Sequence, residues 1–246
     1  MNLNALAKKA AKGPAPAAYG GAMEVEDMIR FTLFHGPIAA DEIERLQRQH
    51  QWVMDGVLPD GGRVVPFGRW AVACVALGRQ GVAGLRPLLD DPAMAEFAVS
   101  VLEKVRSAES VEALVNYCAT ARFAADGYTH PEWVEWQAVM ALNDLLAFDD
   151  FVPVPVATLE KLQGILMVAF ERASNAFLKG TALWAMRGVP TEAALKWVKG
   201  LQLEAPELVS TQKKCIKAIQ KRLSPGFKPL NAEQKRQLRK ERAANV

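Results

Sequence analysis

Apolar residues recur at intervals of three and four along most of this chain, a spacing that predicts amphipathic helices. One such run covers residues 23–35 and stops at Gly36-Pro37. A second begins near Asp41 and ends at Gly56, and residues 57–67, with two prolines and an Asp-Gly-Gly sequence, predict a loop. The opening part of the chain is therefore expected to hold two helices followed by an irregular segment.

After the predicted loop the pattern repeats as a helix, a polar or glycine-containing break, and a second short helix. A pair of small and aliphatic residues closes the first helix of each unit, at Ala76-Leu77, Val101-Leu102, Ala141-Leu142, Ala182-Leu183 and Ala218-Ile219. The second helices are predicted over residues 82–89, 111–118, 156–165 and 191–201. The third unit carries an insertion, FDDFVPVP, at residues 148–155. The sequence therefore predicts an all-α fold.

These units resemble HEAT repeats, a family of paired-helix modules. The resemblance rests on residues 69–90, 94–120 and 175–201. It implies an α-solenoid of stacked antiparallel helix pairs, in which neighbouring pairs share one core because a single pair cannot bury its apolar side. The irregular spacing of the pairs and the missing ladder of aspartates and arginines depart from the family pattern.

Composition divides the chain into three parts. Residues 1–21 predict a flexible N-terminal segment, residues 22–224 a single HEAT-like helical repeat domain, and residues 225–246 a basic C-terminal tail. The last 34 residues hold eleven lysines and arginines against two glutamates, a net charge of +9, so the preceding 212 residues carry −6 of the overall +3. The basic end can serve as a solvated helix, a nucleic-acid-contacting arm or an intramolecular partner for the acidic body.

The last predicted helices differ in how much apolar surface they carry. Residues 211–223 are expected to cap the solenoid, with Ile216, Ile219 and Leu223 facing inward and lysines facing outward. Residues 231–242 predict a short helix with Asn231 as its N-cap and almost no apolar side.

Motifs that would indicate catalysis are missing from the sequence. His35, His50 and His130 lie far apart and show no spacing typical of metal ligands. Neither a nucleophile motif nor a phosphate-binding or dinucleotide-binding glycine loop is present. We therefore expect no catalytic residue, no metal, no cofactor and no enzymatic activity.

Cysteine content and hydropathy favour a cytoplasmic protein. Cys74, Cys118 and Cys215 are far apart within helical patterns, so they are expected to be buried apolar side chains and neither disulfides nor zinc ligands. The sequence has no apolar run of about 18 residues and no signal-peptide pattern, so neither membrane insertion nor export is expected.

An aromatic cluster at residues 128–136, YTHPEWVEW, is the strongest candidate for a surface that binds a partner, since large aromatics anchor many interfaces. Its candidate contact residues are Tyr128, His130, Trp133 and Trp136. The alternative is a repeat helix whose aromatics fill the space before the insertion. Trp70, Trp184 and Trp197 fall on apolar sides and are predicted to lie in the core.

Charged residues supply two further candidate sets. The adjacent aspartates Asp90-Asp91 and Asp149-Asp150 could serve acid–base chemistry, although such pairs at helix ends are typical of caps and turns. Asp149 and Asp150 lie in the insertion and join the candidate partner-binding residues. The candidate nucleic-acid contacts are Lys213, Lys214, Lys217, Lys221 and Arg222.

These observations favour a protein-binding module without catalysis. The chain's size and acidic body suit a bacterial immunity protein that neutralises a cationic toxin domain, or another inhibitor or adaptor. The alternative is a nucleic-acid-binding HEAT-like protein similar to the DNA-alkylation-repair glycosylases, with the basic C-terminal end as its contact. A helical enzyme such as a bilin-lyase-like repeat protein shares the same pattern of helices.

Overall fold

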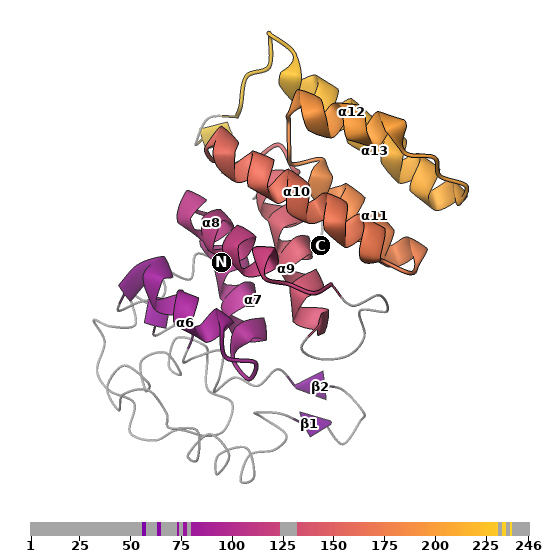
Figure 1. Ribbon diagram of the computed structural model, residues 1–246. Coiled ribbons are helices and arrows are strands. Elements are labelled where there is room, and N and C mark those ends of the chain that lie inside the picture. Colours follow the sequence, from indigo (N-terminus) through magenta and orange to yellow (C-terminus); the bar gives the residue numbers. More distant parts are fainter. Residues whose placement is uncertain are drawn as a thin grey trace, which may run out of the picture. The chain divides into compact units, whose positions relative to one another are not determined.

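The computed structural model describes residues 56–57, 63–64, 73, 76–77, 80–123, 132–230, 233–234 and 237. Apart from one short pair of strands, every secondary-structure element of the described residues is a helix. This confirms the prediction of an all-α fold. The chain divides into two compact units, Met1–Val105 and Arg106–Val246. Most of the two helices predicted before residue 57, and most of residues 231–242, lie outside the described residues (Figure 1).

In the first unit, strand β1 (Gly56–Val57) pairs antiparallel with β2 (Arg63–Val64) inside the predicted loop. The predicted helix over residues 82–89 is a 3₁₀ helix, η1 (Gly81–Leu85), which continues into the short helix α6 (Arg86–Leu89). Glycines at both ends of the 3₁₀ helix weaken it, and Gly81 adopts a positive φ of 65° that other residues rarely take.

Helix α7 (Ala95–Val105) completes the described part of the first unit and packs against α6. It buries Phe97, Val101 and Leu102, in agreement with the predicted Val101-Leu102 pair. The Asp90-Asp91 pair precedes this helix, and the Asp91 carboxylate accepts a hydrogen bond from the backbone N–H of Ala93 at 2.9 Å. Asp91 is therefore a turn residue, which is the role typical of such pairs at helix ends.

The second unit contains six helices in chain order. They are α8 (Ala108–Ala119), α9 (Glu132–Leu146), α10 (Val156–Arg172), α11 (Ala176–Met186), α12 (Glu192–Gly200) and α13 (Pro206–Leu223). Ser107, Asn175 and Thr191 begin three of them, since each side-chain oxygen accepts the backbone N–H three residues further on. The predicted second helices at residues 111–118, 156–165 and 191–201 coincide with α8, the start of α10, and α12.

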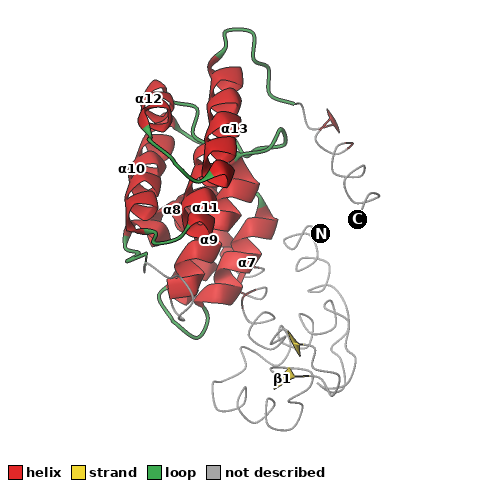
Figure 2. Cartoon of the chain, turned by 90° about the vertical axis from the view of Figure 1, so that its right-hand side faces the viewer, coloured by secondary structure: helices red, strands yellow, loops and turns green. Residues whose placement is uncertain are grey.

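Helix α11 lies at the centre of the second unit, where it contacts α9, α10 and α13 (Figure 2). Consecutive helices also pack on each other, α8 on α9 and α12 on α13, and α8 contacts α10. The predicted pairs Ala141-Leu142 and Ala182-Leu183 are fully buried in this core. The small residues Gly180 and Ala185 of α11 are also buried in this core.

Helix α13 begins five residues before the predicted capping helix, with Pro206 in its first turn. Its buried side follows helical spacing through Leu208, Thr211, Cys215 and Ile219. Ile216 and Leu223, which were expected to face inward with Ile219, are half-buried, and the lysines at positions 213, 214 and 217 are exposed. None of the described helices combines the length and the apolar composition that a membrane crossing requires.

The prediction that Trp184 lies in the core is wrong. Trp184 lies on α11 and is 39% exposed. Phe177, seven residues earlier on the same helix, is 47% exposed. Helix α11 is apolar on nearly every side, so hydrophobic periodicity could not identify its outward face. Trp197 is half-buried and packs edge-to-face on Phe170 at 5.4 Å between ring centroids, whereas Trp70 lies outside the described residues.

Gly188 permits the close approach of α11 to the end of α9. A Cβ atom at this position would lie 2.5 Å from Leu146 Cβ and 2.9 Å from the Leu146 carbonyl carbon. We expect Gly188→Ala to lower the free energy of unfolding by about 1–3 kcal/mol, because the backbone of α9 has to move. Urea unfolding followed by circular dichroism measures the change.

Gly164→Ala is the matched control for this substitution. Gly164 lies on the exposed side of α10, and a Cβ atom added there would have no neighbour within 4 Å. Alanine at this position is expected to raise the free energy of unfolding by about 0.5–1 kcal/mol, since glycine weakens a helix interior. Equal effects of the two substitutions would contradict the packing role of Gly188.

Candidate functional site

The insertion predicted at residues 148–155 forms most of the connection between α9 and α10. We call residues 147–155 the α9–α10 loop. Three arginines from distant parts of the second unit, Arg106, Arg187 and Arg222, bind this loop or the last turn of α9. A helix C-terminus exposes unpaired carbonyl oxygens with partial negative charge, which guanidinium groups neutralise well.

Arg106 fixes the inner side of the loop. Its guanidinium pairs with the Asp144 carboxylate at 2.8 Å and with the Asp150 carboxylate at 3.2 Å, and it also donates to the Asp150 carbonyl oxygen at 3.2 Å. Arg106 itself adopts a left-handed backbone conformation, with a φ of 53°, directly before Ser107. Asp150 is only 4% exposed, so this ion pair is part of the protein interior.

Arg222, near the end of α13, binds the loop from another side. It donates to the carbonyl oxygen of Leu146 and, at 2.8 Å, to that of Phe148. Its guanidinium also lies 4.4 Å from the ring centroid of Phe151, a cation–π distance. Burial lowers the pKa of Arg222 to about 10, with a further lowering by the neighbouring Arg187, while Asp149 opposes both effects.

Arg187, just after α11, binds the last turn of α9 through the Asn143 side-chain oxygen at 2.9 Å. It also donates to the Trp184 carbonyl oxygen, and its guanidinium lies 5.6 Å from the ring centroid of Phe148. Burial lowers the pKa of this guanidinium as well. Each aromatic ring of the loop therefore faces an arginine, and the loop conformation is determined by tertiary contacts.

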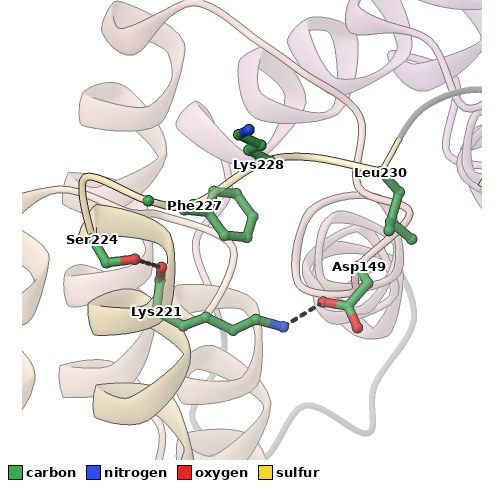
Figure 3. A pocket seen from close by; sticks show the side chains of 7 residues that line it. Asp149, Lys221, Ser224, Phe227, Lys228 and Leu230 are labelled. Atoms are coloured by element: carbon green, nitrogen blue, oxygen red, sulfur yellow. Dashed lines mark hydrogen bonds and ion pairs between the residues drawn. The ribbon is translucent and has the colours of Figure 1, made fainter.

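The outer side of the loop borders an open pocket of about 470 Å³. The pocket is lined by Asp149, Lys221, Ser224, Gly226, Phe227, Lys228 and Leu230. Figure 3 shows the Lys221 side chain extending to Asp149, with the Phe227 ring and Leu230 both on the same side of that ion pair. The Lys221 Nζ to Asp149 Oδ1 distance is 3.0 Å, and the two side chains are 62% and 57% exposed.

The wall formed by Phe227 is connected to the loop beneath it. The Phe227 and Phe151 rings stack with centroids 6.2 Å apart, and Phe151 in turn faces Arg222. The Ser224 hydroxyl donates to the Lys221 carbonyl oxygen at 2.7 Å, which ends α13 and turns the chain toward the pocket. The pocket is therefore built from the last turn of α13, the segment that follows it and Asp149 of the α9–α10 loop.

The fold brings together two residue sets that the sequence analysis kept apart. Asp149, a candidate partner-binding residue, contacts Lys221, a candidate nucleic-acid contact, across 72 positions of sequence. Asp150 and Arg222 lie close by but point into the interior, where they hold the loop. Lys213, Lys214 and Lys217 remain exposed along α13.

The tryptophans of the aromatic cluster at residues 128–136 do not lie on one exposed surface. Trp136 is fully buried and packs edge-to-face on Phe123 at 5.4 Å, so it belongs to the core and is not accessible to a partner. This outcome agrees with the alternative in which aromatics of this helix fill internal space. Trp133 is half-buried, while Tyr128 and His130 lie outside the described residues.

Glu135, which lies between these two tryptophans in the sequence, binds the backbone at residues 122–123, before the cluster. Its carboxylate accepts the backbone N–H groups of Arg122 at 2.9 Å and Phe123 at 2.6 Å. Phe123 has a positive φ of 47°, and Arg172 from α10 donates to the Arg122 carbonyl oxygen at 2.7 Å. This corner is thus a hydrogen-bonded structural junction.

Sequence reasoning missed Arg106, Arg187 and Phe227 as residues of the site. Their contacts to the loop span tens of residues, and each looks like an ordinary helix-end or turn residue when considered locally. The one signal in the sequence was the insertion itself, because a loop with two phenylalanines needs partners that cover them.

Comparisons with known proteins identify no relative of this chain: no protein-family model, no curated protein and no solved structure matches it. Among the residues that the structure describes, no group of three or more histidine, cysteine and acidic side chains is arranged to hold a metal ion.

The two adjacent aspartates of the loop are expected to differ strongly when substituted. Asp150→Ala removes a buried partner of Arg106 and should lower the free energy of unfolding by about 1.5–3 kcal/mol. Asp149→Ala removes an exposed ion pair, so the change should stay below about 1 kcal/mol. Chemical denaturation of the two variants measures the difference, and equal losses would contradict the assignment of Asp150 to the interior.

Cys118 and Cys215 are free and buried, as predicted, whereas Cys74 lies outside the described residues. Burial raises the pKa of both thiols above the ordinary value of 9.0, that of Cys215 to about 12 despite the opposing charge of Arg187. Glu135 adds to the increase at Cys118.

These thiols should make the protein less stable at alkaline pH. The unfolded state loses the Cys215 proton above about pH 9, while the folded state keeps it up to about pH 12, so the free energy of unfolding falls through this window. The slope is about 1.4 kcal/mol per pH unit for one thiol. Urea unfolding at pH 8, 9 and 10 should give a smaller loss for Cys215→Ala than for the parent chain, and parallel losses would contradict the pKa assignment.

Proposed function

We propose that this protein is a protein-binding module of the HEAT-like α-solenoid type, and that the α9–α10 loop and the adjoining pocket form its binding surface. The arrangement of the second unit supports the solenoid. The helices that pack as pairs are α8–α9, α10–α11 and α12–α13, which is one helix out of step with the units predicted from the sequence, where α9 was joined with α10 and α11 with α12. Helix α11 contacts the corresponding helices α9 and α13 of the pairs before and after it. Such stacking shares one core among neighbouring pairs.

The observation that carries the proposal is the way in which the loop is held. Three arginines fix its backbone carbonyls and its two phenylalanine rings from the inside, while Asp149 on its outer side stays exposed. A surface loop that is rigid before binding loses little conformational entropy when a partner docks. Binding sites are commonly loops positioned by a rigid helical scaffold, which is the arrangement found here.

Two exposed aromatic side chains on another surface, that of α11, are a separate argument for protein binding. Phe177 and Trp184 lie seven residues apart on one helix, with 47% and 39% of their surfaces exposed. Tryptophan and other large aromatics contribute more binding energy than most residues in protein interfaces.

A bacterial immunity protein is the narrower form of this proposal. The acidic balance of the chain before residue 213 suits a cationic toxin domain. The candidates for contact with the toxin domain are the exposed glutamates of α8 and α10, namely Glu109, Glu112, Glu160 and Glu171.

Nucleic-acid binding is the second candidate function. Lys213, Lys214 and Lys217 are exposed on α13, and no ion pair of these lysines occurs within the described part of the chain. Regularly spaced cations on one helix suit phosphate contacts.

Photo-crosslinking from the pocket distinguishes the two functions. With p-benzoylphenylalanine in place of Asp149, irradiation of cells that express the chain should give one discrete protein adduct, identified by mass spectrometry. The same group in place of Val168, which is 41% exposed in the second half of α10, is the control and should not give that adduct. Adducts to nucleic acid, or identical protein adducts from both positions, would refute the proposed binding surface.

A further inference from the structure

The pocket beside the α9–α10 loop has a chemical character that limits what it can bind. Its floor is the ion pair between Lys221 and Asp149, and its walls are the Phe227 ring and the Leu230 side chain (Figure 3). Lys228 adds a second cation to the lining. A ligand that fills this pocket therefore needs one apolar group and one charged group.

The charge around the pocket favours an anion. Lys221 and Lys228 outnumber Asp149 in the lining, and Arg222 lies directly behind the loop. Within the described part of the chain, the hydrogen bonds of Arg187 and Arg222 go to carbonyl and amide oxygens, and Asp149 attracts Arg222 without a direct hydrogen bond to it. These two arginines therefore form no direct ion pair with a described carboxylate. The region is cationic although the body of the chain is acidic.

The ion pair on the floor is easily exchanged. Both side chains are more than half exposed, and ion pairs of this kind contribute little to stability. Another carboxylate can therefore take the place of Asp149 on Lys221 at small cost, whereas Asp150 is buried one residue further on and cannot be displaced in this way.

We propose that the pocket receives an acidic segment of a partner protein. A glutamate or aspartate of that segment binds Lys221 in place of Asp149, and a neighbouring aliphatic or aromatic side chain inserts between Phe227 and Leu230. This inference rests on the proposed protein-binding function and specifies the chemistry of the partner segment that enters this pocket. It is separate from the contact proposed between a cationic toxin domain and the glutamates of α8 and α10. A volume of about 470 Å³ accommodates a small number of side chains.

A nucleic acid fits the same pocket less well. A phosphodiester chain gains affinity from several cations along its path, whereas here the floor offers one lysine that is already paired with a carboxylate. The apolar walls also suit a hydrophobic side chain better than a sugar–phosphate backbone. The exposed lysines at positions 213, 214 and 217 offer a more suitable track on α13.

The test is a nuclear magnetic resonance titration of the ¹⁵N-labelled full chain with a synthetic peptide. The probe is acetyl-Leu-Glu-Leu-Glu-amide, and the neutral control is acetyl-Leu-Gln-Leu-Gln-amide. We expect the acidic peptide to shift the backbone amide signals of Asp149, Lys221 and Phe227, and to bind at least about fivefold more tightly than the control.

Three variants assign the contact. Lys221→Gln should weaken binding of the acidic peptide about fivefold or more, while Lys196→Gln, at an exposed position of α12, should leave it unchanged. Asp149→Asn should strengthen binding about threefold, because it removes the intramolecular competitor for Lys221. An unchanged spectrum away from the substituted residue establishes that each variant is folded.

Equal binding of both peptides, or weaker binding by Asp149→Asn, would overturn the inference. So would a hexathymidylate that shifts the same amides while the peptide does not, since that result assigns the pocket to nucleic acid. A protein crosslinked at position 149 without any peptide binding would refute the acidic chemistry alone, and peptide binding without a crosslinked protein would refute only the proposed binding surface in cells.

Discussion

The carbonyl oxygens at the end of α9 and in the loop after it need hydrogen-bond donors, and arginines from distant positions of the second unit provide them. The last turn of a helix leaves carbonyl oxygens without intrahelical partners, and when those oxygens are buried an unpaired group costs about 1–3 kcal/mol. Here Arg222 binds the Leu146 carbonyl of that last turn, and Arg222 and Arg106 also bind the carbonyls of Phe148 and Asp150 in the loop that follows. The two arginines come from positions far apart in the sequence of the second unit. Because these contacts join positions 106, 146 and 222, folding of α8 to α13 and ordering of the loop depend on each other.

Arginine is suited to this position because one guanidinium can bind several oxygens and cover an aromatic ring at the same time. Arg222 binds two carbonyls and faces Phe151, and lysine could not reproduce that planar geometry. The arrangement brings like charges together, since Arg187 contributes to the lowered pKa of Arg222. Packing around the loop must therefore offset both desolvation and repulsion, and the close contact between Gly188 and Leu146, which leaves no space for a methyl group, belongs to that packing.

Local sequence signals were sufficient for the helices and insufficient for the site. Ser107, Asn175 and Thr191 each combine a capping side chain with an apolar period that follows. Of these starts the sequence pattern predicted the one at Thr191, whereas it began α8 three residues late, at residue 111. Trp184 was assigned wrongly because α11 is apolar all round, and periodicity identifies an outward side only where polar residues mark it. The neighbours Asp149 and Asp150 are indistinguishable in sequence, and only Arg106, more than forty positions away, determines which of them turns inward.

The partners that the three arginines bind also determine the charge of the surface around the pocket. Arg106 is neutralised by Asp144 and Asp150, whereas Arg187 and Arg222 bind neutral oxygens and leave positive charge beneath the loop. At the pocket, Asp149 is the acidic side chain in the lining, and it is exposed and paired with Lys221. Since both side chains of this ion pair are exposed, the pair is weak, and a carboxylate of another molecule can take the place of Asp149 on Lys221. The arginines that stabilise the loop from within thus also add positive charge behind its outer surface, which favours the acidic segment that we propose as the ligand.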